Sequence, residues 1–317
     1  MSAAPRVAIA IVSWNTRDLL ERCLESMRPE AEAWRAEVWV FDNASDDGSA
    51  GMVRERFGWV ELIASERNLG FGTAVNEVAT RTSTPWLAPA NADIELEPGA
   101  LAALLAAGTA HPEAGALAPT LIVPGGSIQH SVHPFPSLGL ALAFNTGLAA
   151  AVPGLGDRLC LERRWDPTRG REINWAHGAF VLVRRDAFDA VGGFDPDQWM
   201  YAEDLDLGWR LARAGRPTRF VPAGRVRHEV AAATSQRFVD DERVAQHMAA
   251  AQDWMARRRG RPVARAYAGI NALGSAVRLL ALVPLARLWP RRFAERRALE
   301  SRYMRLHGTG LRGHPTG

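Results

Sequence analysis

The chain of 317 residues contains no lysine, so arginine supplies all 38 of its basic side chains, against 35 acidic ones. It has two cysteines, Cys23 and Cys160, too few for a disulfide framework or for a zinc site built on cysteine. Cys23 falls on the apolar side of an expected helix, where packing explains it. These absences exclude a small disulfide-bonded secreted protein, and a reducing, cytoplasmic compartment fits.

From the sequence we expect neither a secretory leader nor a long, purely apolar run. The first apolar run, 7–12, has only the length of a strand and is followed at once by Ser13 and Asn15. No stretch of 18 residues is purely apolar, so we expect no membrane span. Because the arginines do not alternate with exposed aromatic residues along one expected face, we expect no nucleic-acid binding.

The first third of the chain alternates strand-length apolar runs with helical patterns. The apolar runs are 7–12, 38–41, 60–64 and 86–89, and the helical patterns are 19–27, 72–80 and 99–107. This β-α-β-α-β order predicts an α/β fold in which helices flank a Rossmann-like, mixed but mostly parallel sheet.

The rest of the chain divides into a loop-rich stretch, a return of regular structure and a helical end. Pro, Gly and His are frequent in 119–169, which we interpret as long loops facing an acceptor. Strand and helix patterns return in 174–221, and the pattern is helical from residue 240. We therefore predict an α/β domain over 1–235 and a helical, arginine-rich extension over 236–317.

The extension joins an apolar stretch to a group of cations. Residues 270–289 are apolar apart from Arg278, Pro284 and Arg287, and six arginines follow within 291–305. Such a segment can lie on an anionic membrane surface. It can equally pack on the domain or on a second subunit. Peripheral membrane contact is our working expectation, and both interpretations stay open.

Polar residues follow each of the expected parallel strands, at the sheet edge where open α/β folds bind ligands. They are Ser13, Asn15, Asp42, Asn43, Arg67, Asn68, Asn91 and Asp93. Asp42 can accept a hydrogen bond from a nucleobase N–H, although its surroundings also suit a plain turn. Arg67 lies just before Gly70 and Gly72, which fits a diphosphate approached by backbone, or else a simple glycine-rich connection.

Two further groups of residues suit metal binding and proton transfer. Asp93 ends a buried strand, where packing explains a carboxylate poorly, and Mg²⁺ or Mn²⁺ binds carboxylate and phosphate oxygens together. Such a cation would neutralise a departing nucleoside diphosphate. His228 is either a third metal ligand, as neutral imidazole, or a structural residue. Glu203, Asp204 and Asp206 begin a helix, where acids either complement its dipole or supply a general base.

Six sequence strings, in this order, resemble family 2 glycosyltransferases of the GT-A fold. They are IVSWNTRDLLERCLESM, VFDNASDDGS, ERNLGFGTAVN, NADIELEPGAL, HGAFVLVRRDAFDAVGGFDPDQWMYAEDLDLGWRLARAG and VRHEV. The resemblance covers residues 7–230. It is strongest to rhamnosyltransferase-like members, which act on polyprenyl-diphosphate-linked sugars in bacterial cell-wall and polysaccharide assembly.

The resemblance implies how the donor is bound. Asp42 matches the nucleobase pocket, and it is followed by Asn43. Arg67, Asn68 and Asn76 match the wall around the diphosphate and the donor sugar.

The resemblance also implies the metal ligands and the base. Asp93 matches the last acid of the metal-binding DXD motif, whose first acid is replaced here by Asn91, so one carboxylate would hold the metal. His228 matches a metal-coordinating histidine. In the ED motif, Asp204 matches the base and Glu203 the residue that positions the acceptor.

The reaction expected from the resemblance is inverting transfer without a covalent intermediate. We expect L-rhamnose to move from dTDP-rhamnose to a hydroxyl of a lipid-linked or polysaccharide acceptor, in the cytoplasm or at the inner face of the cell membrane. UDP-glucose, UDP-galactofuranose and UDP-N-acetylglucosamine are alternative donors. A non-catalytic nucleotide-sugar-binding protein would predict damaged metal or base positions, whereas a membrane scaffold would need only the arginine-rich end.

Overall fold

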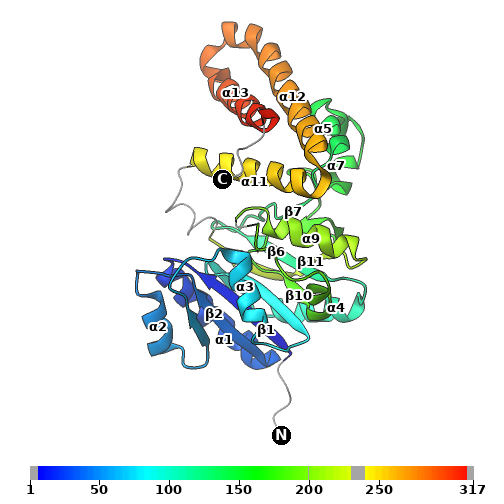
Figure 1. Cartoon of the computed structure of the whole chain (residues 1–317). Helices are drawn as coiled ribbons and strands as arrows, with labels where there is room; N and C mark the ends of the chain where they lie inside the picture. The colour runs from blue at the N-terminus through cyan, green and yellow to red at the C-terminus, as the bar shows by residue number, and fades with distance from the viewer. Residues whose placement is uncertain (1–5, 199, 230–239, 313–317) are drawn as a thin grey trace. The chain divides into compact units, whose positions relative to one another are not determined.

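The computed structural model describes residues 6–198, 200–229 and 240–312 (Figure 1). The chain forms two compact units, Met1–Phe135 with Cys160–Val239, and Pro136–Leu159 with Asp240–Gly317. The predicted boundary at residue 235 lies outside the described residues. The structure places 136–159 with the C-terminal helices, whereas the sequence analysis placed this segment in the α/β domain.

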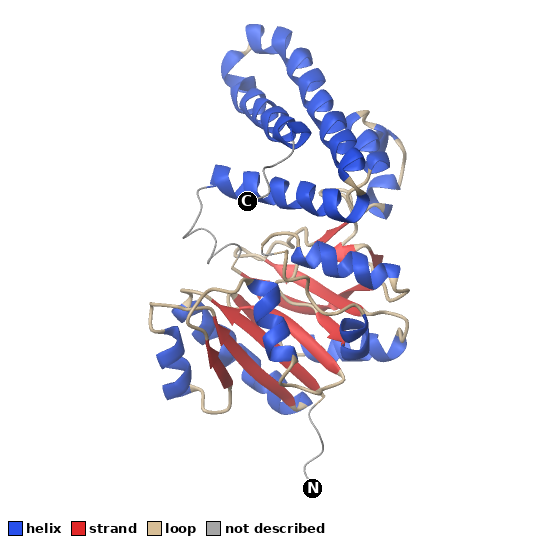
Figure 2. Ribbon diagram, in the orientation of Figure 1, coloured by secondary structure: helices blue, strands red, loops and turns tan. Residues whose placement is uncertain are grey.

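In the described part of the first unit, nine strands form one mixed sheet in the order β3-β2-β1-β4-β10-β6-β11-β5, with β8 paired to β11 (Figure 2). The strands are β1 (Val7–Ser13), β2 (Ala36–Asp42), β3 (Glu61–Ala64), β4 (Trp86–Asn91), β5 (Ile94–Leu96), β6 (Ala116–Ile122), β8 (Arg171–Ile173), β10 (Leu182–Arg184) and β11 (Thr218–His228). Strands β3, β2, β1 and β4 run parallel, whereas β10 and β5 pair antiparallel with their neighbours. The predicted mixed sheet with flanking helices is confirmed.

Helices cover both faces of this sheet. They are α1 (Arg17–Trp34), α2 (Ser49–Arg56), α3 (Phe71–Ala79), α4 (Ala100–Ala110), α8 (Arg185–Ala190) and α9 (Glu203–Arg213). Side chains alternate along a strand, so Ile9 and Ile11 of β1 belong to the core beneath α1, α2 and α4. Ala8 and Ala10 belong to the opposite core, beneath α3, α8 and α9. Cys23 of α1 is fully buried, as the packing interpretation predicted.

A buried carboxylate joins α1 to the start of α4. Glu30 accepts hydrogen bonds from the backbone N–H groups of Gly99 (2.7 Å) and Leu101 (3.0 Å). The first N–H groups of a helix have no partner within the helix, and a negative charge there is favoured by the helix dipole. Glu30 thus supplies the cap that Gly99, which has no side chain, cannot provide.

The second unit is helical in its described residues. Its helices are α5 (Leu138–Asn145), α6 (Leu148–Ala151), α7 (Leu155–Arg158), α11 (Asp240–Arg259), α12 (Arg261–Leu288) and α13 (Pro290–Arg312). Asn145 of α5 donates a hydrogen bond to Asn271 of α12 (2.9 Å) and accepts one from Arg278 (2.8 Å). These bonds explain why the segment containing α5 groups with helices more than a hundred residues later.

Helix α12 contains a segment, Arg261–Pro284, that is long and apolar enough to cross a membrane by length and composition, with a mean hydropathy of 1.5. No membrane span was expected from the sequence, because no stretch of 18 residues is purely apolar. Inside this segment, the Arg278 guanidinium pairs with the Glu300 carboxylate of α13 at 2.8 Å. Long apolar helices that pack within a soluble protein meet the same criterion.

Candidate functional site

The carboxyl ends of the parallel strands meet at one edge of the sheet. The strand register places Ser13 opposite Asp42, and Val12 opposite Asn91. Hydrogen bonds continue the alignment past the strand ends, because Asn43 N–H donates to the Ser13 carbonyl (2.8 Å). The structure therefore brings together the residues that the sequence analysis selected after β1, β2 and β4.

Asp42 is the buried acceptor at this edge. One of its oxygens, Oδ2, accepts a hydrogen bond from Ser45 N–H (3.1 Å), whereas Oδ1 has no partner in the described structure. Asn15, with a φ of 52°, accepts from Asp46 N–H (2.9 Å) and donates its own N–H to Ser45 Oγ (2.9 Å). These bonds fix the two loops, and the orphaned Asp42 oxygen suits a donor on a ligand, such as a pyrimidine N–H.

Asn43 and Asn68 shape the loop after β3 through backbone contacts. Asn43 accepts from Leu69 N–H (2.9 Å) and donates to the Gly70 carbonyl (3.3 Å). Asn68 accepts from Gly70 N–H (2.9 Å). The side chain of Arg67, beside this loop, is exposed. An exposed guanidinium at this edge is available to a diphosphate, which remains a prediction.

The side-chain amide of Asn76, in α3, is hydrogen-bonded to the backbone of Phe194. Its amide donates to the Phe194 carbonyl (2.8 Å) and accepts from Phe194 N–H (2.9 Å). A Cβ added at the neighbouring Gly193, which has a φ of +69°, would lie 2.6 Å from Asn76 Oδ1. Asn76 therefore clamps the turn before α9 to α3, and direct contact with the donor stays a prediction.

Asp93 and His228 face each other where β5 pairs with β11. The register places His228 opposite Ile94, and Glu229 N–H donates to the Asp93 carbonyl (2.9 Å). His228 Nε2 lies 3.5 Å from Asp93 Oδ1, and both side chains are 8% exposed. Asp93 Oδ1 makes no hydrogen bond within the described residues.

An orphaned carboxylate oxygen beside an imidazole nitrogen fits a divalent cation. In 6–198, 200–229 and 240–312, no group of three or more His, Cys, Asp or Glu residues is placed to hold a metal. Asp93 and His228 would thus supply two ligands, and the remaining ones would come from diphosphate oxygens and water. Asn91, at the end of β4 and two residues before Asp93, is half-buried.

Glu203 and Asp204 form the first turn of α9. Asp204 Oδ2 accepts from Gly178 N–H (2.9 Å), and Oδ1 accepts from Leu205 N–H (2.8 Å). Burial raises the pKa of Asp204 to about 6, although these N–H groups oppose the rise. Burial, and then the charge of Asp204, raise the pKa of Glu203 to about 8. Burial thus raises the pKa of both carboxyls, and more for Glu203 than for Asp204, which favours keeping one proton on the pair near neutral pH.

Backbone bonds connect this acid pair to the end of β4. Ala179 accepts a hydrogen bond from Asn91 N–H (2.9 Å), and its neighbour Gly178 donates to Asp204. Asn91 is two residues before Asp93. Backbone hydrogen bonds therefore connect the segments that hold the base candidate Asp204 and the metal candidate Asp93.

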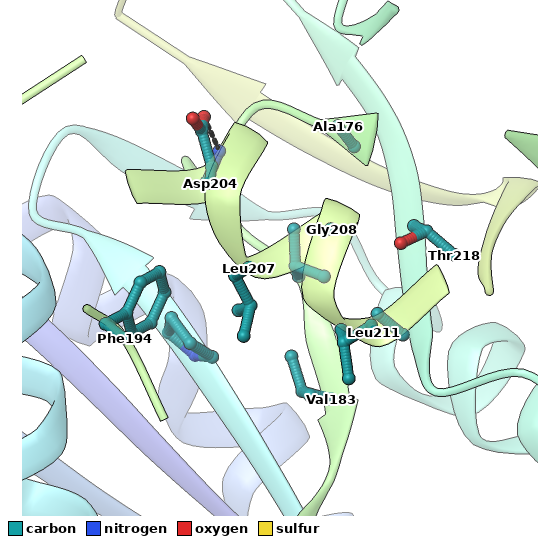
Figure 3. A pocket seen from close by; sticks show the side chains of 12 residues that line it. Ala176, Val183, Phe194, Asp204, Leu207, Gly208, Leu211 and Thr218 are labelled. Atoms are coloured by element: carbon teal, nitrogen blue, oxygen red, sulfur yellow. Dashed lines mark hydrogen bonds between the residues drawn. The ribbon is translucent and has the colours of Figure 1, made fainter. Parts of the chain in front are cut away.

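A small pocket lies beside Asp204, between α9 and the sheet (Figure 3). Its volume of about 20 Å³ has room for roughly one water molecule. Leu207, Leu211 and Phe194 give it a mostly apolar lining, and the Asp204 carboxylate turns away from them toward its hydrogen bond with Gly178. This pocket is a packing gap beneath α9, and a nucleotide sugar needs the wider edge formed by the strand ends.

Sequence reasoning missed two residues that support these groups. Gly178 holds Asp204 through its backbone, and Gln129 lies 2.8 Å from His228 Nδ1. Gln129 falls in the loop-rich stretch, where no periodicity marks a residue. Gly178 lies inside the string that carried the resemblance, but its N–H is not visible as a feature of sequence.

Comparisons with known proteins identify the family of the chain. The family model described as glycosyl transferase family 2 matches residues 8–192, and that described as glycosyl transferase family group 2 matches 164–293. The N-acetylglucosaminyl-diphospho-decaprenol L-rhamnosyltransferase of Mycobacterium tuberculosis is 35% identical over 244 residues, which are 72% of this chain and 77% of that protein. The rhamnosyltransferase WbbL of Escherichia coli is 47% identical over 51 residues, 16% of this chain and 19% of that protein.

A solved structure shares the fold. The mannosyltransferase of Pyrobaculum calidifontis, in complex with GDP-Man and Mn²⁺, superposes with a TM-score of 0.61 at 18% identity, covering 98% of this chain and 88% of that one. This likeness shows a GT-A-like fold with C-terminal helices. Together with the match over more than half of the sequence, it establishes that the chain belongs to glycosyltransferase family 2.

Proposed function

We propose that this glycosyltransferase moves L-rhamnose from dTDP-rhamnose to a hydroxyl of a polyprenyl-diphosphate-linked sugar, with inversion at the anomeric carbon. The observation that carries the proposal is that backbone hydrogen bonds link the segment holding Asp204 to the end of β4, just before Asp93, whose Oδ1 has no hydrogen-bond partner in the described residues. The sugar and the acceptor are supported by the relative that is 35% identical, an N-acetylglucosaminyl-diphospho-decaprenol L-rhamnosyltransferase.

Each residue then has a defined task. Asp42 Oδ1 accepts the ring N–H of the nucleobase. Asp93 and His228 would hold Mg²⁺ or Mn²⁺, which would offset the negative charge of the diphosphate. The acceptor oxygen forms a bond to the anomeric carbon as the bond to the diphosphate breaks on the opposite face. Its proton passes to Asp204, and the protonated Glu203 donates a hydrogen bond that positions the acceptor.

The nucleobase pocket does not distinguish a dTDP-sugar from a UDP-sugar, because thymine and uracil present the same ring N–H to Asp42. The donor must therefore be identified by experiment. The test is a donor screen with dTDP-rhamnose, UDP-galactofuranose, UDP-glucose and UDP-N-acetylglucosamine. Release of the nucleotide is measured with a polyprenyl-diphosphate-N-acetylglucosamine acceptor, in Mn²⁺ and in EDTA. We expect turnover of dTDP-rhamnose that needs both Mn²⁺ and the acceptor. Turnover of a UDP-sugar alone would replace the donor, and tight binding without any turnover would favour a non-catalytic protein.

We also propose that the second unit binds the anionic surface of a membrane. Twelve of the 13 large apolar side chains that are exposed in the described residues belong to this unit. On α12, Leu273, Val277 and Leu280 are 66%, 56% and 71% exposed and recur once per helical turn, so they form one stripe. Nearby in the same unit, α5 exposes Leu142 and Phe144.

The charge of α12 and α13 indicates the partner of this apolar stripe. These helices hold eleven arginines and two glutamates, and one arginine, Arg278, is paired with one glutamate, Glu300. The side chains of Arg291, Arg292 and Arg296 are exposed. An apolar stripe next to cations matches a bilayer rich in anionic lipid, such as the inner face of a cell membrane.

Vesicle sedimentation tests this surface. Full-length protein is expected to pellet with phosphatidylglycerol-containing vesicles, less with phosphatidylcholine vesicles, and less at high salt. Replacing Arg291, Arg292, Arg296 and Arg297 by serine should weaken binding by about a thousandfold, at about 1 kcal/mol for each arginine. Leu280→Asp should weaken it further, whereas Ile128→Asp on the first unit is the matched control. Unchanged binding in the arginine variant, or resistance to carbonate extraction as expected of a spanning helix, would contradict a peripheral site.

A further inference from the structure

A chain of side-chain contacts continues from His228 away from Asp93. His228 Nδ1 lies 2.8 Å from Gln129 Oε1, and Gln129 Nε2 lies 3.4 Å from His177 Nδ1. His177 Nε2 in turn lies 3.0 Å from His133 Nε2. The chain therefore links four polar side chains from three separate segments of the first unit.

Backbone pairing holds Gln129 in this position. Its N–H donates to the Leu121 carbonyl (2.9 Å) at the end of β6, and Ile128 forms a bridge with Ile122. The short strands β7 (Val132–His133) and β9 (Trp175–Ala176) pair antiparallel. His133 at the end of β7 and His177 directly after β9 therefore lie close together. The Gln129 amide therefore lies between His228 and His177 because of the local fold.

The chemistry of the amide fixes where the protons lie. An amide oxygen accepts hydrogen bonds and an amide nitrogen donates them. Gln129 Oε1 therefore needs a proton on His228 Nδ1, which leaves the lone pair of neutral His228 on Nε2, the atom that faces Asp93. This is the tautomer of a neutral imidazole that can bind a cation through Nε2.

The contacts of His133, at the far end of this series of side chains, are consistent with the same orientation of the Gln129 amide. Burial, and then the neighbouring His177 and His130, lower the pKa of His133 well below 6.5, so His133 is neutral. Its Nε2 can then accept from His177 Nε2–H, which leaves His177 Nδ1 to accept from Gln129 Nε2. The contacts on both sides of the amide are thus consistent with the oxygen pointing toward His228, as the structure places it.

We propose that Gln129 is a positioning residue that sets the ring orientation and the tautomer of His228 for a divalent cation. This proposal rests on the cation site of the proposed function. Outer partners of a metal-binding histidine affect metal affinity because they fix the ring and its protonation. Through His177, which precedes Gly178, the same contacts reach the segment that holds Asp204.

Mn²⁺ binding tests the role of Gln129 without any sugar. Titration of the full-length protein with Mn²⁺ at saturating dTDP, followed by electron paramagnetic resonance, should show about 10- to 100-fold weaker binding in Gln129→Leu. Gln129→Glu should stay close to wild type, because a carboxylate oxygen also accepts from Nδ1–H. Gln252→Leu, which removes the contact with His307 in the second unit, is the matched control and should bind as wild type does.

A second readout separates positioning from a general structural role. Binding of dTDP in EDTA and the thermal midpoint should be alike in wild type and both Gln129 variants. Wild-type Mn²⁺ affinity in Gln129→Leu, or equal losses in the Leu and Glu variants, would overturn the proposal. Absence of Mn²⁺ binding in wild type would overturn it together with the cation site, whereas an error in the donor sugar would leave these measurements unchanged.

Discussion

Lowering the pH from 7 to 5 should reduce kcat/KM for sugar transfer about tenfold, because the base Asp204 becomes protonated. With a pKa of about 6, Asp204 is about 90% ionised at pH 7 and about 9% ionised at pH 5. An aspartate at the ordinary value of 3.8 would stay more than about 90% ionised over this range. The size of the fall thus reports the burial of the carboxyl beside Gly178 and Leu205.

The assay is nucleotide release from dTDP-rhamnose at subsaturating donor, with Mn²⁺ occupancy verified at each pH. Above pH 8, loss of the Glu203 proton should lower the rate again, and Glu203→Gln should remove this upper limb. Asp204→Asn should transfer the sugar slowly, at a rate that does not fall between pH 7 and pH 5. A flat profile between pH 7 and pH 5 in the wild type would refute proton transfer to a buried Asp204.

Three further substitutions test separate parts of the structure. Asp93→Asn should abolish measurable Mn²⁺ binding in the presence of dTDP while dTDP binding in EDTA is kept; retained Mn²⁺ affinity would exclude Asp93 as a ligand. Asp42→Asn should weaken dTDP binding roughly 10- to 100-fold by calorimetry, because the thymine N–H loses a carboxylate acceptor. Equal affinity would show that thymine binds elsewhere. Glu30→Ala should lower the free energy of unfolding, measured in urea, by about 3 kcal/mol, because two charge-assisted hydrogen bonds are lost. Glu32→Ala, at an exposed position of the same helix, is the control. Equal effects of the two substitutions would show that Glu30 does not cap α4.

The strand ends could be predicted because an apolar run that stops at a polar residue is a local pattern. The runs before Ser13, Asp42 and Asn91 are buried on both faces, and parallel strands must align their carboxyl ends. This reasoning was sufficient for the parallel strands β1, β2 and β4 and for the edge where the candidate residues lie.

The partners of amide side chains could not be predicted, because they are set by tertiary contacts. Asn76 meets Phe194 at a separation of 118 residues, and Gln129 meets His228 at 99. Neither partner leaves a periodic trace in sequence. For the same reason the grouping of α5 with α12, through Asn145 and Asn271, was missed.

A single-turnover transfer experiment tests most directly whether Asp204 takes the proton at the strand end that carries Asp93. Wild type and Asp204→Asn are loaded with Mn²⁺ and dTDP-rhamnose, mixed with the polyprenyl-diphosphate acceptor and quenched at intervals. The variant should bind Mn²⁺ and dTDP as the wild type does and transfer the sugar at least about a hundredfold more slowly. Transfer by Asp204→Asn at the wild-type rate would show that another group accepts the proton.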